Sequence, residues 1–191
     1  MEFRLLHITC CSATFELVNR DIYQTKESHS VFVDDVLVLK TRRNVFSVFD
    51  LSPDREYVIR VEDTAMSIHT LKVSYVLHMK DFVRGSHEKD DTLRVQMAIS
   101  MLPKDGLLVF DDGDYHVTSL FLKSNITLQL TRNARILGNT DRDCYPLAPG
   151  EIAPFDNRDK PLELVSWEGN PLIGKPSLIN GYEVENVEIV G

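Results

Sequence analysis

The chain contains 191 residues, of which 43% are hydrophobic and 26% charged, and its formal net charge is −8. This length and composition fit one large soluble globular domain or two small ones. The acidic balance disfavours nucleic acid and anionic membranes as partners. No apolar run approaches the roughly 18 residues that span a bilayer, and the N-terminal residues lack the basic and apolar regions of a signal peptide. We therefore expect no membrane association and a cytoplasmic location.

Cysteine usage indicates a reducing compartment. The three cysteines, Cys10, Cys11 and Cys144, are odd in number and lack the spacing of metal ligands. Neighbouring side chains on a strand point to opposite faces, so Cys10 and Cys11 are poorly placed to share one disulfide. The sequence also has no Gly-rich phosphate loop, and we expect no cofactor.

Residues 1–80 predict a small all-β domain. β-branched and aromatic runs alternate with turn residues, a pattern that disfavours helix. Asp34 and Asp35 are placed to turn a hairpin between two apolar runs. Several short strands in this length favour a β-sandwich. The predicted strand runs are FRLLHI, SATFELV, SVFVDDVLVLK, NVFSVFDL, REYVIRVED and TLKVSYVLH.

One phrase in this part has a known structural counterpart. Residues 51–57, LSPDREY, resemble the tyrosine corner of fibronectin type III domains. In that arrangement Tyr57 would pack inward at the start of a strand, and its hydroxyl would bond back to the preceding turn. The alternative is an ordinary proline turn followed by a strand tyrosine.

A charged stretch with few apolar residues, residues 79–89, indicates the domain boundary, which we place between residues 80 and 81. A helix is predicted next. Asp90 or Asp91 is expected to cap its N-terminus by accepting free backbone N–H groups.

The helix has a single apolar face, with residues at the i, i+3, i+4 and i+7 spacing. These residues are Val95, Ala98, Ile99 and Leu102. Burial of the three large side chains would contribute about 1.5–3 kcal/mol each. Pro103 and Gly106 are expected to end the helix.

Short apolar runs separated by Gly, Asp and Asn follow the helix: LLVF, YHV, SLFL, ITLQL and ARILG. The phrase SNITL at residues 124–128 recurs 61 positions later as ENVEI at residues 185–189. A repeated strand–turn–strand unit behind a capping helix predicts the first coils of a right-handed parallel β-helix. The last repeat stops at Gly191, so we expect an apparently truncated stack with an open end and possible self-association through that end.

Residues 140–176 interrupt the repeat. Six prolines in this stretch break any regular element. We expect an excursion from one coil, partly packed through its aromatic residues, after which residues 184–191 resume the stack.

Several phrases resemble glycoside hydrolase family 28, the polygalacturonases of the pectate-lyase-like β-helix class. Residues 90–92 resemble the opening of the family's capping helix, residues 113–115 its Gly-x-Tyr turn, and residues 120–128 a strand pair of the first coils. Residues 167–172, WEGNPL, resemble a phrase of the bacterial members. The resemblance covers about residues 81–191.

The first 80 residues resemble the fibronectin-type module that precedes the catalytic domain in some bacterial, exo-acting members. Two departures concern loops. The family's Gly-Asp-Gly loop before the helix is replaced by residues 85–89, GSHEK, and its Pro-rich turn by Asp111-Asp112. The resemblance implies an all-β chain with a fibronectin type III-like sandwich over residues 1–80 and the cap and first coils of the β-helix over residues 81–191.

The resemblance also implies inverting hydrolysis, which needs two carboxyl groups about 6.5–9.5 Å apart. The family supplies them with Asn-Thr-Asp, Asp-Asp, Gly-His-Gly and Arg-Ile-Lys phrases on later coils, and the last two phrases are absent from this sequence. Asn139-Thr140-Asp141 matches the first phrase, but no Asp-Asp pair follows it, and it lies in a segment that resembles a non-catalytic phrase of the family. We therefore assign no catalytic residue within this chain.

Other candidate sites are weaker. Residues 111–114, DDGD, lack the spaced ligands and final Glu of a calcium loop, so a solvated turn is expected. Asn125 begins a glycosylation sequon but is expected to be a turn residue. The six histidines form no close metal pair: His7, His29, His69, His78, His87 and His116. Trp167, the single tryptophan, is a candidate substrate-binding residue that stacks on sugar rings; the alternative is that it packs the excursion onto the helix.

The sequence leaves two alternative functions for the chain. In the first, the chain is the N-terminal part of a polygalacturonase-like glycoside hydrolase that acts on polygalacturonate or oligogalacturonates, and these 191 residues alone are inactive. In the second, it is a non-catalytic carbohydrate-binding or scaffold module. A sugar-binding β-helix unrelated to pectin is a further alternative.

Overall fold

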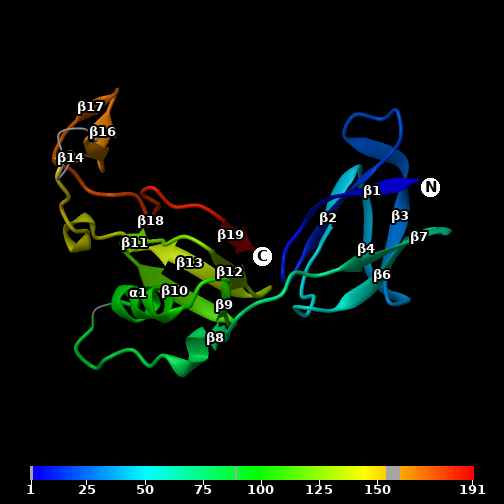
Figure 1. Ribbon diagram of the computed structural model, residues 1–191, viewed down its shortest axis with the longest axis horizontal. Helices are drawn as coiled ribbons and strands as arrows, with labels where there is room; N and C mark the ends of the chain where they lie inside the picture. Colours follow the sequence, from blue (N-terminus) through cyan, green and yellow to red (C-terminus); the bar gives the residue numbers. More distant parts are fainter. Residues whose placement is uncertain (1, 89, 154–159) are drawn as a thin grey trace. The chain divides into compact units, whose positions relative to one another are not determined.

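A computed structural model describes residues 2–88, 90–153 and 160–191. The chain forms two compact units, one of residues up to Ser74 and one of residues 75–189 (Figure 1). The sequence placed the boundary between residues 80 and 81. In the structure β8 (Val76–His78) already pairs in parallel with a strand of the second unit, so the second unit starts earlier in the chain.

The first unit contains two antiparallel sheets. One has the order β1-β2-β5 and the other β4-β3-β6-β7. Apolar side chains of both sheets share one core, in which Phe15, Val31 and Ile59 are fully buried. The two sheets therefore pack face to face. The strand bounds are β1 (Phe3–Ile8), β2 (Ala13–Leu17), β3 (Gln24–Val33), β4 (Val36–Arg43), β5 (Val45–Val48), β6 (Glu56–Val61) and β7 (Thr64–His69).

Local turn chemistry explains two hairpins of this unit. The hairpin predicted at Asp34 and Asp35 is confirmed, because both residues have positive φ and Val33 pairs with Val36 across them. The strand predicted over TLKVSYVLH is wrong over residues 70–75, which are not strand. The strand β7 lies earlier in the sequence, at residues 64–69. It starts there because the chain turns tightly after β6 at Glu62, which has a φ of 49°.

Tyr57 makes the hydrogen bond that the sequence predicted. Its ring is buried, and its hydroxyl oxygen accepts a hydrogen bond of 2.7 Å from the backbone N–H of Ser52 in the preceding turn. The guanidinium of Arg55 lies 4.6 Å from the centre of the ring. This bond fixes the turn to the strand that follows it.

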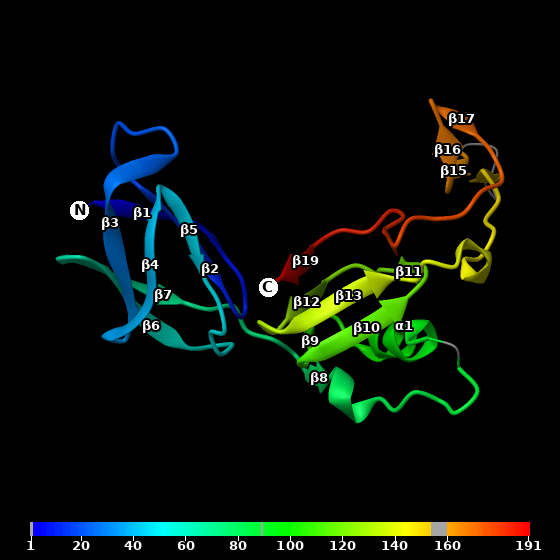
Figure 2. The same cartoon turned by 180° about the vertical axis from the view of Figure 1, so that it is seen from behind.

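The second unit is a stack of parallel strands. Along the chain β9, β12 and β19 recur in one sheet, β10 and β13 in a second, and β11 and β18 in a third (Figure 2). Two successive coils, β9–β10–β11 and β12–β13–β18, therefore each contribute one strand to each of three sheets, and β8 and β19 are the edge strands of the first sheet. The bounds are β9 (Gly106–Phe110), β10 (Gly113–Val117), β11 (Leu120–Phe121), β12 (Ile126–Leu130), β13 (Ala134–Gly138), β18 (Ile179–Asn180) and β19 (Val187–Val190).

The repeat detected in the sequence stacks as predicted. The backbone N–H of Asn125 donates to the carbonyl of Glu185 at 2.9 Å, and the amide of Asn186 donates to the side-chain oxygen of Asn125 at 3.0 Å. Asp105 precedes the equivalent strand one coil earlier and donates its N–H to the carbonyl of Asn125. Asp105, Asn125 and Asn186 all have positive φ, between 53° and 60°. They form a column of left-handed turns, a conformation that Asn and Asp tolerate.

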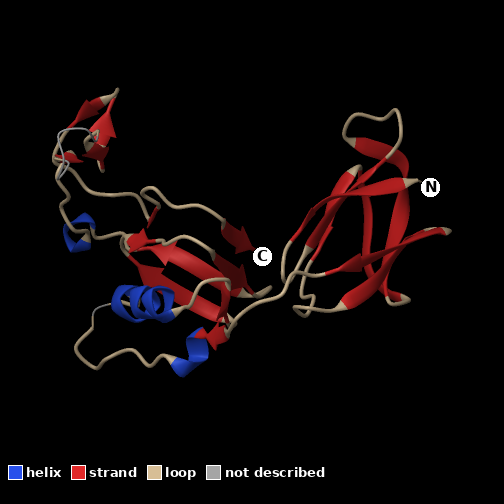
Figure 3. Ribbon diagram, in the orientation of Figure 1, coloured by secondary structure: helices blue, strands red, loops and turns tan. Residues whose placement is uncertain are grey.

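The helix α1 (Thr92–Met101) packs against the coil interior (Figure 3). Its predicted apolar face is confirmed, because Val95, Ala98 and Ile99, together with the C-cap residue Leu102, are at most 1% exposed. Two short 3₁₀ helices, η1 (Met79–Asp81) and η2 (Arg142–Cys144), lie elsewhere in this unit. Apart from these helical segments, the described residues form strands, turns and loops, so the chain is all-β in class.

The excursion begins after β13 and rejoins the stack at β18. It contains two small antiparallel pairs that stand away from the stacked strands in Figures 1 and 2. Gly150 is required where two backbones meet, because a Cβ there would lie 2.2 Å from the nitrogen of Leu172. The bounds are β14 (Glu151–Ile152), β15 (Leu162–Glu163), β16 (Ser166–Trp167) and β17 (Asn170–Pro171). Part of the excursion, residues 154–159, lies outside the described residues.

Candidate functional site

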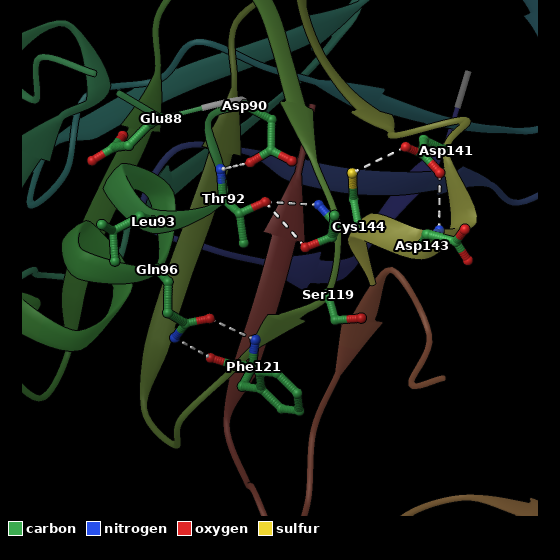
Figure 4. A pocket seen from close by; sticks show the side chains of 11 residues that line it. Glu88, Asp90, Thr92, Leu93, Gln96, Ser119, Phe121, Asp141, Asp143 and Cys144 are labelled. Carbon is green, nitrogen blue, oxygen red and sulfur yellow. Dashed lines mark hydrogen bonds between the residues drawn. The ribbon is translucent and has the colours of Figure 1, made fainter. Parts of the chain in front are cut away.

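A cleft beside α1 is the candidate site of the second unit (Figure 4). Its volume is about 550 Å³. It lies between α1, the turn from β10 into β11, and the segment around η2. The lining residues are Glu88, Asp90, Thr92, Leu93, Gln96, Thr118, Ser119, Phe121, Asp141, Asp143 and Cys144.

Side-chain bonds to backbone hold one wall of the cleft in place. The Thr92 hydroxyl oxygen accepts from the N–H of Thr118 at 2.8 Å, and the two hydroxyls lie 3.2 Å apart. One turn later the Gln96 amide accepts from the N–H of Phe121 at 2.8 Å and donates to its carbonyl at 2.9 Å. The helix side chains therefore satisfy backbone groups of β11 and of the turn before it, as a neighbouring strand would.

Asp90 lies at the start of the helix in this wall. Its carboxylate accepts from the N–H of Thr92 at 2.9 Å and from the amide of Asn139 at 3.3 Å. Burial alone would raise the pKa of Asp90, but the bonds from Thr92 and Asn139 and the charge of Arg84 outweigh it, so the pKa is lowered. An ionised Asp90 can act as a base but cannot donate a proton to a leaving oxygen at neutral pH.

Asp91 was expected to be a possible cap, and its carboxylate serves a different purpose. It occupies the N-cap position, but its side chain accepts no capping bond from a backbone N–H of the helix. Its backbone N–H donates to the carbonyl of His116 at 2.7 Å, and its carboxylate accepts from the N–H of His116 and from Arg94, each at 2.8 Å. Asp91 thus ties the helix to β10, and the free N–H of Thr92 is taken by Asp90.

The Asn-Thr-Asp phrase at residues 139–141 contributes Asp141 to the opposite wall. The Asn139 side chain accepts from the N–H of Asp141 at 3.0 Å. The Asp141 carboxylate accepts from the N–H of Asp143 at 3.0 Å, which caps η2, and from the thiol of Cys144 at 3.5 Å. Each bond ties the phrase to its own turn. The structure brings Asp141 and Asp90 to one cleft, which their sequence separation did not indicate.

The acidic phrase at residues 111–114 consists of the bend before β10 and the first two residues of that strand. Asp112 accepts from Thr131 at 2.5 Å and from Asn133 at 2.9 Å, and Asp114 makes two bonds of 2.7 Å with Arg135. These bonds link consecutive coils, and they lower the pKa of both carboxyl groups. Among residues 2–88, 90–153 and 160–191, no group of three or more His, Cys, Asp or Glu side chains is arranged to hold a metal ion.

Trp167 lies on β16 in the excursion, away from the cleft. Its side chain is 70% exposed, so the alternative that it packs the excursion onto the helix is wrong. The reason is the β16–β17 hairpin, in which Trp167 pairs with Asn170 and is presented to solvent.

None of the cleft residues on α1 was singled out from the sequence, because the cleft arises only when the helix meets β11 and η2. No helix within the described residues is long and apolar enough to cross a membrane.

The comparisons with known proteins point to one fold. No protein-family model and no curated protein sequence matches the chain. Among solved structures, the family 28 exopolygalacturonase of Yersinia enterocolitica matches with a TM-score of 0.60 at 16% sequence identity, over 98% of this chain and 39% of that one. The fold is polygalacturonase-like. This chain spans about two-fifths of the length of the exopolygalacturonase. The central fibronectin-III array of RIM-binding protein matches at a TM-score of 0.32 and 23% identity, over 39% of this chain and 28% of that one.

Proposed function

We propose that the chain is the N-terminal part of a polygalacturonase-like glycoside hydrolase. In this proposal a fibronectin type III-like sandwich precedes the cap and first coils of a right-handed parallel β-helix. The observation that carries the proposal is the fold likeness to an exopolygalacturonase over 98% of the chain. The parallel, in-register pairing of β9 with β12 and the place of β19 beside β12 in the same sheet support it further.

The proposed reaction of the whole protein is inverting hydrolysis of α-1,4-galacturonic acid linkages in pectin or oligogalacturonates. Such a reaction needs one carboxylic acid at the leaving oxygen and one carboxylate that activates water. In the cleft, Asp90 is held in its ionised form and Asp141 is bonded to its own turn. The cleft carboxylates therefore serve the structure in this proposal, and the acid and base belong to later coils.

These 191 residues alone are expected to release no reducing sugar from polygalacturonate or oligogalacturonates. The physical reason is that the lowered pKa of Asp90 keeps it from serving as the protonated acid, and Asp141 is bonded within its own turn. The measurement is a reducing-sugar assay at several pH values. Turnover that an Asp141→Asn variant loses and an Asp143→Asn variant keeps would assign the chemistry to Asp141 and overturn the proposal of inactivity.

A second candidate function is carbohydrate binding through the excursion, and the exposure of Trp167 favours it. A solvent-facing indole offers an apolar face on which a sugar ring can stack. Because Trp167 is the single tryptophan, its fluorescence reports directly on this site. We expect saturable quenching on titration with oligogalacturonate.

The matched control for this titration is an Asn170→Ala variant, which keeps the indole and removes only the side chain at the position paired with it across the hairpin. Calorimetry with a Trp167→Ala variant should show no heat of binding. A flat fluorescence response of the unaltered chain would eliminate the binding function and leave the first candidate.

A further inference from the structure

The outer side of α1 carries a second apolar stripe. Leu93, Met97 and Met101 recur every four residues, and they are 54%, 49% and 64% exposed. The buried stripe of the same helix already supplies its packing against the coils. The exposed stripe therefore contributes little to the fold, and a contiguous exposed apolar surface of this kind is typical of an interaction site.

The cleft of Figure 4 continues this stripe. Leu93 belongs to both, and Phe121 adds an apolar side chain on the far side of the cleft. Methionine side chains are flexible and polarisable, so they adapt to apolar partners of different shape. Together the stripe and the cleft form one surface, which we call the α1 surface: Leu93, Met97, Met101, Phe121 and the cleft carboxylates.

The charge at the rim of the α1 surface selects the partner. The carboxyl groups of Glu88, Asp90, Asp141 and Asp143 line the cleft, and none of its described lining residues is basic. Two of these four carboxylates have a cationic neighbour, because Lys175 lies 3.5 Å from Asp143 and the charge of Arg84 acts on Asp90. The rim therefore stays negative. Negative rims attract cationic ligands and repel anionic ones such as galacturonate. The α1 surface is therefore unsuited to the substrate class of the proposed function.

We propose that the α1 surface binds a basic amphipathic peptide segment of a partner protein. Apolar side chains of the segment lie over Leu93 and Met97 and reach the cleft, and its Lys or Arg side chains meet the carboxylates at the rim. The segment is thus recognised as an amphipathic helix whose apolar face contacts the stripe, and its charged side chains fix its orientation on the surface. The proposal adds an interaction to the chain and does not depend on the hydrolase proposal.

The test uses the whole chain and a fluorescein-labelled helical peptide of leucine and lysine, with leucines on one face. Fluorescence anisotropy should show saturable binding that weakens at about 0.3 M salt, because salt screens the rim charges. A peptide of the same pattern with glutamate in place of lysine should not bind. Absence of lysine-peptide binding, or equal binding of both peptides, would overturn the proposal.

Two variants of Met97 separate apolar contact from simple charge attraction. Met97→Lys should weaken binding of the lysine peptide about tenfold or more, the effect of losing roughly 1.4 kcal/mol at a central contact. Met97→Glu should also weaken it, although it adds a negative charge. If Met97→Glu binds as tightly as the unaltered chain, the attraction is electrostatic alone and the proposal fails.

The matched control is Val58→Lys, a similarly exposed apolar position (44%) on β6 of the first unit. It makes the same change in charge and should leave the affinity unchanged. Equal losses in Met97→Lys and Val58→Lys would show that binding is unspecific and would contradict the proposal. Binding of the chain to neutral phosphatidylcholine vesicles without peptide binding would assign the surface to lipid instead.

Discussion

Replacement of Asp91 by alanine is expected to lower the free energy of unfolding of the second unit by about 3–5 kcal/mol, the usual cost of removing one partner from a buried ion pair. The Asp91 side chain is 4% exposed, and Arg94 beside it is 20% exposed. The substitution removes the carboxylate that pairs with Arg94 and leaves the N–H of His116 without its acceptor. Calorimetric unfolding should show the transition of the second unit at a lower temperature.

The matched control is Asp114→Asn, which breaks another carboxylate–arginine pair with two short bonds. That pair is exposed to solvent, so the loss of stability should be much smaller. The transition of the first unit should not move in either variant. Equal shifts for Asp91→Ala and Asp114→Asn would contradict the role assigned to Asp91.

Acidification is expected to destabilise the first unit through His29. The imidazole is 1% exposed against Phe46, and among the described residues neither ring nitrogen has a hydrogen-bond partner. Burial lowers the pKa of His29, and the nearby charge of Glu62 opposes this only in part. Below pH about 6.5 the unfolded chain binds a proton that the folded unit does not. The free energy of unfolding therefore decreases as the pH is lowered, by up to about 1.4 kcal/mol per pH unit. The decrease stops once the pH is below the lowered pKa of His29 in the folded unit.

Urea unfolding of the first unit at a series of pH values from neutral to mildly acidic measures this slope. His29→Phe keeps a ring beside Phe46 and cannot titrate, so its unfolding midpoint should change less over the same range. The exposed His7 provides the control, and His7→Gln should keep the full slope. The role of His29 would be refuted if His29→Phe and the unaltered chain lost stability in parallel.

Periodic patterns made the fold largely predictable. The buried face of α1 was evident from four apolar residues at helical spacing, and all four are buried. The bounds of β12 and β13 match the predicted runs ITLQL and ARILG, because each run is short and ends at turn residues. Tyr57 was recognisable from its turn, since a proline and a tyrosine at this spacing impose a local geometry.

The site was less predictable, because tertiary contacts decide it. Asp91 looked like any residue that precedes a helix, and only the neighbouring β10 makes its carboxylate a tie between two elements. Asn139 meets Asp90 across 49 positions of sequence, a contact that no local pattern indicates. The exposure of Trp167 also depends on a hairpin that the proline content of the excursion concealed.

The column of Asp105, Asn125 and Asn186 has a consequence for how such a chain can change. The first two residues are 20 positions apart and the last two 61, yet all three stack in the same left-handed turn. Alignment of the coils is thus insensitive to the length of chain between them. The segment from β13 to β18 is a natural insertion point, where loops of other lengths or grafted binding modules can be accommodated while the scaffold keeps its register.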